Sequence, residues 1–410
     1  MNATLYIAKR LISSKLDKGS SSGPIIKVSI ASIAIGIIVL ILAVASGSGL
    51  EQKIKEKILI FNSPIQISHL DFYSQYDFPA LKQNPKLEQT LENHPKLRAV
   101  HQAAYKSALL KNGEDVSGVV FKGYDSDLAL NKLKDFITAG RLPDFEHEKG
   151  SQEVLISETL AKKMNYKLDE QIFLFVVDQE RMKERVRPLK IVGLYEVGLS
   201  GFDELILFGD IKIVQKLNRW KEQEFAFLEL ETKSQQGLES LKEELRAELP
   251  FDLRIRDLRQ LHPELIAWVD TFDNNIFILL IIIGIVASIN MISTILISML
   301  ERSEMVGILK SIGMNNGKIR QVFLYYMLYL VAKGLLIGNA IGLLIYFLQT
   351  TFHIIPLDQK NYHVDYVPMN LPFSSFIFLN LGILTISFLI LVLPSYFVKR
   401  IQPIQVLKFK

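Results

Sequence analysis

The chain has 410 residues, of which 49% are hydrophobic and 22% are charged, and its formal net charge is +4. This apolar content is too high for an ordinary soluble enzyme, and this charged content excludes a wholly buried bundle, so the composition indicates a protein that is part membrane and part water-exposed. The small net charge gives no support to nucleic-acid binding. The absence of cysteine excludes disulfides, thiolate catalysis and zinc–thiolate sites.

Four apolar runs have the length of a membrane span. A helix needs roughly 20 residues to cross the hydrocarbon layer, and the sequence predicts transmembrane helices over residues 28–50, 273–300, 321–352 and 371–398. A cleaved signal sequence is an alternative for the first run, because Ala43-Val44-Ala45 precedes Ser46. Both the run and its leader are long for a signal, however, and cleavage would leave an odd number of spans.

Cationic residues predict the orientation. Five of them (Lys9, Arg10, Lys15, Lys18 and Lys27) precede the first run, whereas the loop at residues 353–370 holds only Lys360. By the positive-inside rule, residues 1–27, the loop at 301–320 and the tail at 399–410 are cytoplasmic. Residues 51–272 then form one large domain on the far side of the membrane.

The spacing in this outside domain predicts mixed structure. Leu50, Ile54, Ile58 and Phe61 recur at helical spacing, so the first helix is expected to continue beyond its span, and residues 258–272 show the same pattern before the second span. A hairpin is predicted at Asn112-Gly113.

Further along, strand–helix–strand units are predicted within residues 153–177 and 225–257, and a charged hairpin tip at 178–187. We predict two lobes, with an inserted lobe at about residues 106–222. The predicted fold class is a polytopic α-helical membrane protein with four transmembrane helices, both termini inside, and a large two-lobed α+β extracytoplasmic domain between helices 1 and 2.

The loop after the second span carries an amphipathic pattern. Met305, Ile308, Leu309 and Ile312 are expected to form one apolar face, and Gly313 is a natural helix stop. This face fits either a helix lying on the membrane surface or a coupling helix seated in a groove of an ATPase subunit.

Polar and small residues also occur inside the predicted spans. Gly334, Gly338 and Gly342 form a ridge that lets helices approach closely. Lys333 lies roughly 20 Å along the helix from Arg320, where a charge is costly unless it is paired or hydrated. A structural pair, deprotonation and contact with a substrate all remain open for Lys333.

Several segments together resemble a known family. They are IAKRL before the first span; GVVFKGYD, EVLISETLAKKMNYKLDEQIFL and LKIVGLYEVGLSGFDELILF in the outside domain; and IVASINMISTILISMLERSEMVGILKSIGMNNGKIRQVF from the second span onward. In order and spacing they resemble the FtsX-like permease family of ABC transporters, and most closely its LolC/LolE lipoprotein-releasing type. The resemblance covers nearly the whole chain.

This resemblance implies a non-translocating transporter of the inner membrane, with its large domain in the periplasm. Cytoplasmic ABC ATPase subunits would drive this chain and a second permease, either another copy or a paralogue, to extract a lipoprotein from the outer leaflet and pass it to a periplasmic carrier. The chain has no GxxxxGK[ST] motif, so it cannot bind ATP in the P-loop manner. ATP and Mg are therefore assigned to the separate ATPase, and no cofactor is expected on this chain.

The resemblance also assigns roles to residues. ATPase coupling falls on residues of the cytoplasmic loop: Glu301, Arg302, Glu304, Met305, Gly307, Ile308, Lys310 and Gly313. Residues of the first two spans are candidates to line a lipoprotein cavity, although helix packing explains such positions too: Ile38, Leu42, Ser46, Gly49, Phe277 and Leu280. Residues of the hairpin tip are candidates to contact the carrier: Gln179, Glu180, Arg181, Met182 and Lys183.

That hairpin is shorter than the resemblance leads us to expect, so an ordinary solvated hairpin is an alternative to a carrier grip. Seven histidines are scattered without an HExxH motif, and no GxSxG motif occurs. We therefore expect no catalytic or metal site. Three other functions stay open: a mechanotransmitter that activates a cell-wall hydrolase, an exporter of peptides or small molecules, and a membrane-anchored sensor.

Overall fold

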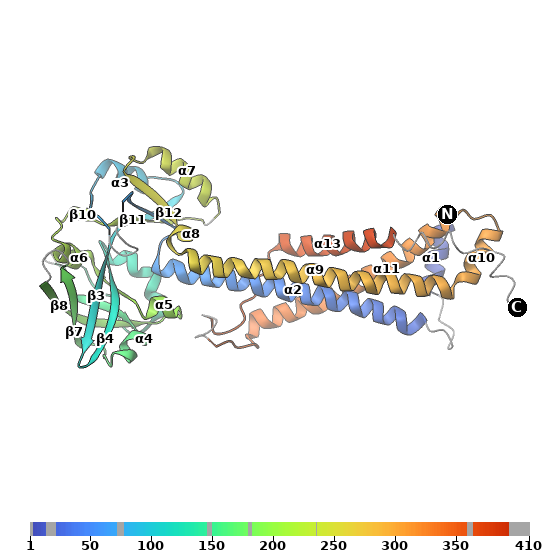
Figure 1. Cartoon of the computed structure of the whole chain (residues 1–410), viewed down its shortest axis with the longest axis horizontal. Helices are drawn as coiled ribbons and strands as arrows, with labels where there is room; N and C mark the ends of the chain where they lie inside the picture. Colours follow the sequence, from blue (N-terminus) through green and yellow to red (C-terminus); the bar gives the residue numbers. More distant parts are fainter. Residues whose placement is uncertain are drawn as a thin grey trace. The chain divides into compact units, whose positions relative to one another are not determined.

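The computed structural model describes residues 3–13, 22–71, 78–145, 150–178, 183–234, 236–358 and 364–392 (Figure 1). The chain divides into two compact units. One unit comprises Met1–Gln52, Asp270–Leu357 and Tyr366–Lys410, and is called the helical unit below. The other comprises Lys53–Val269 and Asp358–Asp365, and is called the sheet unit.

Four long helices and two short ones are described in the helical unit. They are α1 (Ala3–Ser13), α2 (Ser22–Phe61), α9 (Pro263–Glu301), α10 (Ser303–Ser311), α11 (Asn316–Phe352) and α13 (Phe373–Val392). Two helices among the described residues are long and apolar enough to cross a membrane, at Ile26–Phe61 and Asn316–Phe352. The described parts of α9 and α13 contain shorter apolar stretches, Phe277–Val286 and Phe373–Ser387, so the count of four spans stays a prediction.

Helices α2 and α9 extend past their apolar runs. The predicted continuation of the first helix beyond residue 50 is confirmed, because α2 ends only at Phe61. The predicted amphipathic stretch before the second span is likewise helical, since α8 (Leu258–Leu261) and then α9 begin there. The residues of α2 and α9 are therefore shared between the helical unit and the sheet unit.

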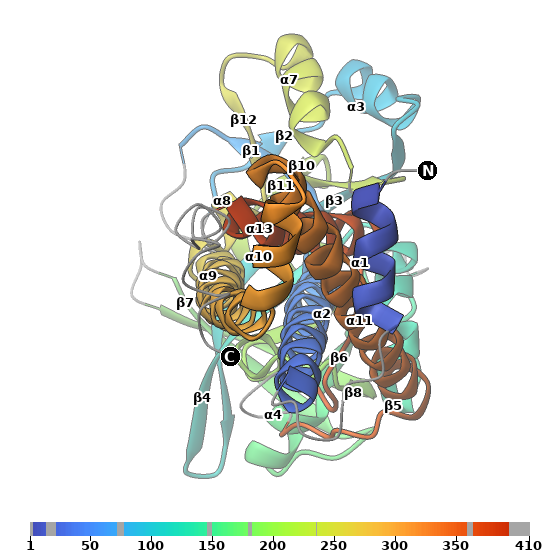
Figure 2. The ribbon, with the colours of Figure 1, turned by 90° about the vertical axis from the view of Figure 1, so that its right-hand side faces the viewer.

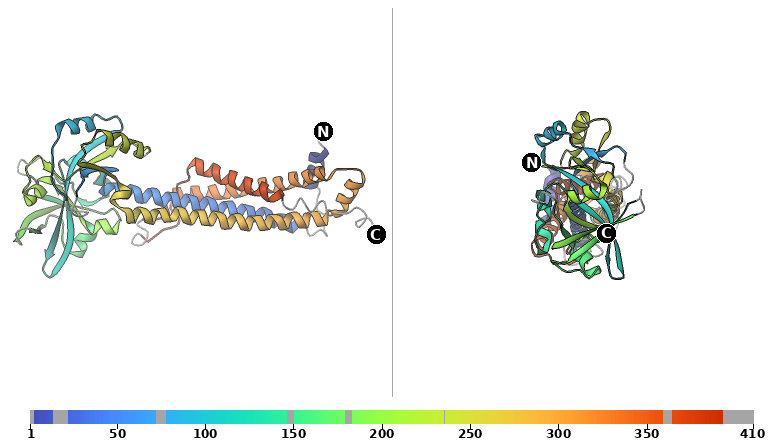
Figure 3. Two further views of the ribbon diagram at one scale, coloured as in Figure 1. Left: turned by 45° about the horizontal axis from the view of Figure 1, so that its top comes forward. Right: turned by 90° about the vertical axis from the view of Figure 1, so that its left-hand side faces the viewer.

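The glycine ridge of α11 packs against α2. A methyl group added at Gly334 would lie 2.7 Å from the Ile33 side chain, and one at Gly338 would collide with the Ile37 side chain. Ile37 and Ile41 are completely buried in this contact. The ridge is thus a helix–helix contact, and Figures 2 and 3 show α11 running along α2.

A mixed β-sheet forms the sheet unit. Its strands are β1 (Ile65–His69), β3 (Leu97–Asn112), β4 (Asp115–Tyr124), β5 (Ile137–Gly140), β6 (Glu153–Ser157), β7 (Gln171–Asp178), β8 (Lys183–Tyr195), β9 (Ile206–Asp210), β11 (Phe227–Thr232) and β12 (Leu253–Asp257). Neighbouring strands follow the order β12-β1-β11-β3-β4-β9-β6-β8-β5. A separate pair joins β2 (Leu81–Lys82) to β10 (Glu224–Phe225).

Strand β7 closes part of this sheet into a ring. It pairs with β8 along its length and with the far end of β3, so that β3, β4, β9, β6, β8 and β7 follow one another back to the start. Closing a sheet removes unpaired edges between these strands. Because β3 pairs with β11 at one end and with β7 at the other, the lobe boundary predicted near residue 106 falls inside a single strand.

Short helices cover the sheet. They are α3 (Pro85–Glu92), the 3₁₀ helix η1 (Asp127–Phe136), α4 (Glu158–Lys163), α5 (Ser200–Asp203), α6 (Ile211–Asn218) and α7 (Leu238–Glu248). Local chemistry sets their ends: the Ser157 hydroxyl accepts a bond from the Leu160 amide and starts α4, and Asp257 and Gln260 form a capping box on α8.

The predicted strand–helix–strand units are confirmed as β6-α4-β7 and β11-α7-β12. The predicted hairpin is also confirmed, since Asn112 pairs with Asp115 and Gly113 has a φ of +61°. The hairpin tip predicted at 178–187 is too wide, because Lys183 to Arg187 already pair with β7.

Replacing Gly338 by alanine should destabilise the contact between α2 and α11. The new methyl group would meet the Ile37 side chain and would lie 2.8 Å from the Ala34 carbonyl oxygen, and such overpacking costs about 1–3 kcal/mol. Gly382→Ala in α13 is the matched control, because no atom of the described residues lies within 4 Å of its added methyl group. It should gain up to about 1 kcal/mol from helix propensity. Thermal unfolding in detergent measures both variants, and equal stability would contradict the packing described here.

Candidate functional site

The loop after α9 folds into a short helix whose inner side is buried. Val306 of α10 is completely buried, in a cluster with Ala8 of α1 and with Phe323 and Met327 of α11. Gly307 is buried as well. Gly313 ends the segment at a φ of +88°, which confirms the predicted helix stop and favours glycine there.

The predicted single apolar face of this helix is wrong in part. Met305 and Leu309 are half-buried and pack against the cluster around Val306, whereas Ile308 and Ile312 are 45% and 77% exposed. The face is divided because Met305 and Leu309 lie beside Val306 on the side that packs against α1 and α11. The exposed apolar side chains of this segment are therefore Ile308 and Ile312, with Glu304 exposed beside them.

The remaining residues predicted to couple the ATPase lie around this surface. Arg302 and Lys310 are half-buried. The side chain of Glu301, the last residue of α9, lies outside the described part of the structure.

An apolar groove lies between α2, α9 and α13. Its volume is about 270 Å³, and one glycine from each helix opens it: Gly36, Gly284 and Gly382. Apolar side chains and two serines line the rest: Ile33, Leu40, Leu280, Ile283, Ser288, Phe378, Leu379, Ile383, Ile386 and Ser387. Helix α13 therefore lines this groove together with α2 and α9.

Most residues proposed from the resemblance to line a lipoprotein cavity do not line this groove. Leu280 lines the groove, and Phe277 is 64% exposed one turn earlier on α9. Ile38 faces Gly342 of α11, Leu42 is half-buried without lining the groove, and the Ser46 hydroxyl donates to the Ala43 carbonyl. The three glycines that open the groove lie on three different helices, so they form no periodic pattern along the sequence that could have singled them out.

Gly49 contacts a loop and does not line the groove. The backbone carbonyl of Pro368 lies directly over it, and the Asn370 amide donates to the Ala45 carbonyl at 2.8 Å. The Asn370 side chain also donates to Gln52 at 2.6 Å. The segment after α11 is thus seated on α2, and a side chain at position 49 would displace it.

Lys333 turns outward from the helical unit. Its side chain is exposed, and its ammonium group lies 4.7 Å from the centre of the Tyr329 ring, one turn earlier on α11. This is a cation–π contact, which partly compensates the charge. A structural pair, deprotonation and contact with a substrate all stay predictions for Lys333.

Most of the predicted carrier-contact residues lie outside the described part of the structure. Gln179, Glu180, Arg181 and Met182 are not among the described residues, and Lys183 is described only as the first residue of β8. The charged tip therefore remains a prediction.

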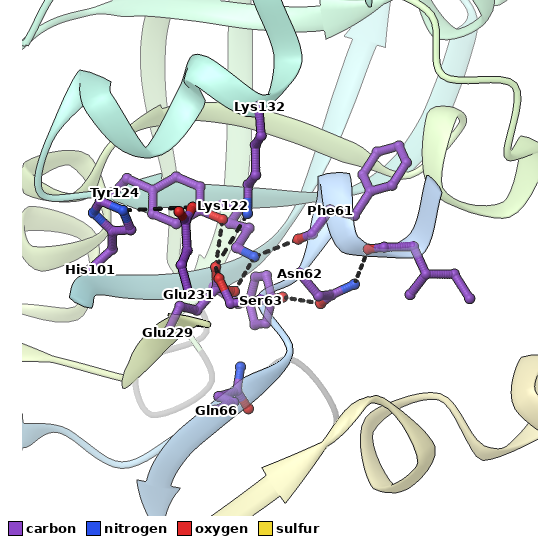
Figure 4. Close-up of polar contacts among 12 residues, drawn as sticks. Phe61, Asn62, Ser63, Gln66, His101, Lys122, Tyr124, Lys132, Glu229 and Glu231 are labelled. Carbon is purple, nitrogen blue, oxygen red and sulfur yellow. Dashed lines mark hydrogen bonds and ion pairs between the residues drawn. The ribbon is translucent and has the colours of Figure 1, made fainter. Parts of the chain in front are cut away.

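A buried polar network, which the sequence analysis did not predict, surrounds the end of α2 (Figure 4). The ammonium group of Lys122 on β4 donates to the carbonyl oxygen of Phe61, the last residue of α2, at 2.6 Å. It also forms an ion pair with the carboxylate of Glu229 on β11, and both side chains are at most 1% exposed. A cation at a helix C-terminus satisfies a free carbonyl group and interacts favourably with the helix dipole.

Further donors complete the network around Glu229. The Tyr124 hydroxyl donates to it at 2.8 Å and the Ser63 hydroxyl at 3.1 Å, while the Lys132 ammonium lies 3.6 Å away. The rings of Tyr105, Tyr124 and Phe227 surround the Lys122 ammonium at 5.0–5.9 Å. Each buried charge therefore has several partners, as burial requires.

The pKa values of the pair follow from this environment. Burial alone would raise the pKa of Glu229, but the charges of Lys122 and Lys132 and the bonds from Lys122 and Tyr124 outweigh it and lower the pKa to about 2. Burial lowers the pKa of Lys122 to about 8, although Glu229 opposes this shift. Both groups are thus predominantly ionised at neutral pH.

Aromatic rings connect this network to the start of α9. The Phe61 ring stacks on Phe202 of α5 at 4.8 Å, and Phe202 meets the His262 ring edge-on at 5.1 Å. His262 directly precedes α9, and its carbonyl accepts the amide of Ile266. Burial, followed by the charges of Lys122 and Arg256, lowers the pKa of His262 to about 4, so this ring is neutral at physiological pH.

One signal in the sequence could have found this pair. Lys122 interrupts the buried apolar strand Val119–Tyr124, and Glu229 interrupts Phe227–Leu230. A charge on the inward side of a strand needs a partner, and these two have opposite signs. Among the described residues, no cluster of three or more histidine, aspartate or glutamate side chains is placed to hold a metal ion.

Family models match both parts of the chain. A model described as the MacB-like periplasmic core domain matches residues 28–248, more than half of the sequence, and one described as the FtsX-like permease C-terminal region matches residues 277–403. The chain therefore belongs to the FtsX-like family of ABC transporter permeases that carry a MacB-like periplasmic core domain.

Two relatives match along almost their whole length. The lipoprotein-releasing system transmembrane protein LolE of Haemophilus influenzae is 23% identical over 438 aligned residues, which cover 99% of each chain. The corresponding LolC protein of Neisseria meningitidis serogroup B is 22% identical over 420 residues, with the same coverage.

Two solved structures are also similar. The periplasmic region of MacB from Actinobacillus actinomycetemcomitans is 14% identical, with a TM-score of 0.35, and covers 52% of this chain and 91% of its own. The extracellular domain of the noncanonic ABC-type transporter YknZ from Gram-positive bacteria is 13% identical, with a TM-score of 0.33, and covers 47% of this chain and 99% of its own.

Glu229→Gln should destabilise the sheet unit in a pH-dependent way. Because folding lowers the pKa of Glu229 from 4.5 to about 2, its stabilising contribution is complete above about pH 4.5 and is lost as the pH falls toward 2. The variant should be about 3 kcal/mol less stable than the wild type at pH 7, and this difference should shrink in acid. Urea unfolding followed by the fluorescence of Trp220 and Trp268, both in the sheet unit, measures it.

Glu204→Gln is the control for this measurement. Glu204 pairs with Lys163 at 3.0 Å on the surface, with both side chains about half exposed, so its loss should cost less than about 1 kcal/mol. A stability difference for Glu229→Gln that stays constant down to pH 2.5 would contradict the assigned role of the ionised carboxylate.

Proposed function

We propose that this chain is the permease subunit of an ABC-type lipoprotein-releasing complex of the inner membrane. The observation that carries the proposal is the similarity to LolE and LolC over 99% of both chains, which includes the membrane helices, the outside domain and the loop between α9 and α11. In this proposal the chain has four membrane spans, with residues 51–272 in the periplasm, and it couples ATP hydrolysis on a separate polypeptide to extraction of lipoproteins from the outer leaflet and transfer to a periplasmic carrier.

The surface formed by Ile308 and Ile312 is the proposed seat of the ATPase. Both side chains are exposed on a short helix whose other side is fixed by Val306. A rigid, half-buried helix transmits a push better than a mobile loop, because its inner contacts resist displacement. Exposed isoleucines beside Glu304 fit a groove with an apolar floor and a polar rim.

The groove between α2, α9 and α13 is the proposed contact for an acyl chain. Within a membrane the available occupants are hydrocarbon chains and helices. A helix with its side chains is roughly 10–12 Å across and rises about 5.4 Å per turn, so one turn occupies about 500 Å³, which exceeds the groove's volume of about 270 Å³. An apolar cavity of about 150 Å³ is sufficient for benzene, so this groove has room for part of a single hydrocarbon chain.

Purification of the tagged chain from its own membrane tests the proposal. We expect an ABC ATPase, a second permease copy or paralogue, and lipoproteins to elute with it. ATP should then release those lipoproteins from proteoliposomes when a periplasmic carrier is present. A cell-wall hydrolase in place of lipoproteins would favour a mechanotransmitter, and an intact complex that releases no lipoprotein would contradict the proposal.

Ile308→Asp combined with Ile312→Asp should abolish co-purification of the ATPase. The two carboxylates would have to be desolvated against the ATPase, and an unpaired buried charge costs several kcal/mol. Phe251→Asp is the matched control, because Phe251 is 96% exposed in the sheet unit. The ATPase retained by wild type and by each variant is measured on blots of the eluate, and equal retention would rule out this surface.

A photocrosslinking residue at Leu280 or Phe378 should capture the acyl chain of a lipoprotein. Both side chains line the groove. The same probe at Leu336, which is 71% exposed on α11 outside the groove, is the control for random contact with lipid. Capture is measured by mass spectrometry of the crosslinked peptide. Equal capture at all three positions would exclude a specific site.

A further inference from the structure

The network at the end of α2 is more elaborate than stability requires. Replacing a buried ion pair by well-packed apolar residues is often neutral or stabilising, so Lys122 and Glu229 are not explained by stability alone. The ion pair fixes the orientation of the end of α2, because the Lys122 ammonium must bind the Phe61 carbonyl and the Glu229 carboxylate at the same time. An apolar contact at the same place would tolerate rotation of the helix end.

Both long helices meet the sheet unit at this point. Helix α2 ends at Phe61, whose carbonyl binds Lys122 and whose ring stacks on Phe202. Helix α9 begins after His262, whose ring packs against the same Phe202. The last turn of α2 is fixed further by Asn62, which donates from its amide and its side chain to the Ile58 carbonyl and accepts from the Tyr105 hydroxyl.

We propose that Lys122 and Glu229, together with Phe61, Phe202 and His262, form a joint that fixes the ends of α2 and α9 in the sheet unit, so that a movement of these helices is converted into movement of that unit. Lys122 and Glu229 are positioning residues in this joint. The inference rests on the proposed function, because it is the ATPase that sets the helices in motion, and it adds the place where that motion is received.

The surroundings of the pair support a positioning role. Partners of Lys122 and Glu229 come from β3, β4, β11, η1 and the segment that follows α2, so that the ion pair ties elements distant in sequence to one helix end. Figure 4 shows Lys122 between Phe61 and Glu229. Removal of these directional bonds should leave a packed sheet with a helix end that is free to turn.

The test replaces the ion pair by apolar residues, with Lys122→Met and Glu229→Leu in one chain. The control is Lys163→Met with Glu204→Leu, an exposed pair of the same residue types in the same unit. Both variants are purified as the complete complex in proteoliposomes. Thermal unfolding, ATP hydrolysis and the number of lipoprotein molecules released per ATP hydrolysed are measured for each.

We expect the apolar pair to preserve unfolding temperature and ATP hydrolysis while release per ATP falls about tenfold, the size of a typical coupling between two sites. The control should match the wild type in all three. Release per ATP equal to the wild type in a folded Lys122→Met, Glu229→Leu complex would overturn the joint.

If the Lys122→Met, Glu229→Leu chain does not fold, a milder variant tests the proposal. Tyr124→Phe with Ser63→Ala removes two neutral donors to Glu229 and keeps both charges. We expect a smaller loss of release per ATP with unchanged ATP hydrolysis. Unchanged release in this variant would overturn the proposal.

Hydrogen–deuterium exchange separates failure of the joint from failure of the proposed function, since it needs neither an ATPase nor a lipoprotein. In the Lys122→Met, Glu229→Leu chain, or in the milder variant where that chain does not fold, amides at residues 59–63 and 264–266 should exchange faster together, with the sheet strands unchanged. Faster exchange at the end of α2 alone would overturn a joint shared by both helices. A wild-type complex that releases no lipoprotein would refute the proposed function and leave this result to decide the joint.

Discussion

The carbonyl oxygen at the end of α2 is bound by the ammonium group of Lys122, and the charge of Lys122 is balanced by Glu229. Neither charge has access to water, so each must be satisfied by protein atoms. This constraint decides how β4 and β11 face the helix and why hydroxyl groups of Tyr124 and Ser63 point inward. It also places the last turn of α2 among the aromatic rings that lead to α9. The sheet unit is therefore built around the end of a helix as much as around its own apolar core.

The helical unit obeys a different constraint, which is close contact between backbones. Glycines on α11 admit the isoleucines of α2, and glycines on α2, α9 and α13 line a groove among the described side chains. The same residue type therefore has two consequences in one bundle, a tight contact and an opening. Asn339 and Asn380 add polar contacts, donating to each other's side-chain oxygens between α11 and α13. Hydrogen bonds of this kind contribute modestly between membrane helices but select one alignment.

Local patterns in the sequence predicted much of the fold. Helical spacing at Ile54 and Ile58 predicted the extension of α2, and Asn112-Gly113 predicted the β3–β4 turn, because both depend on neighbouring residues. The ring of strands was not predicted, since the pairing of β3 with β7 joins residues far apart in sequence. For the same reason the pattern at Met305 to Ile312 predicted an apolar helix correctly but could not tell which side would be covered by α1 and α11.

The residues of the candidate sites divide along similar lines. Periodicity singled out Ile308, whereas it singled out neither the groove nor the Lys122–Glu229 pair, because a single charge or glycine gives no periodic signal. Gly49, which the family resemblance offered as a candidate to line a lipoprotein cavity, lies in close contact with the backbone at Pro368. A small residue in a span thus has an ambiguous meaning until its neighbours from distant segments are known.

The turn of the β3–β4 hairpin is a suitable site for inserting a foreign sequence. Within the described part of the chain, no atom lies within 4 Å of a methyl group added at Gly113 in its turn, and the pairing of β3 with β4 is complete up to Asn112 and Asp115. Exposed loop tips of this kind tolerate inserted sequence. An affinity handle or a small fluorescent module can therefore be grafted into this turn, which would report on the sheet unit in living cells while both long helices keep their natural sequence.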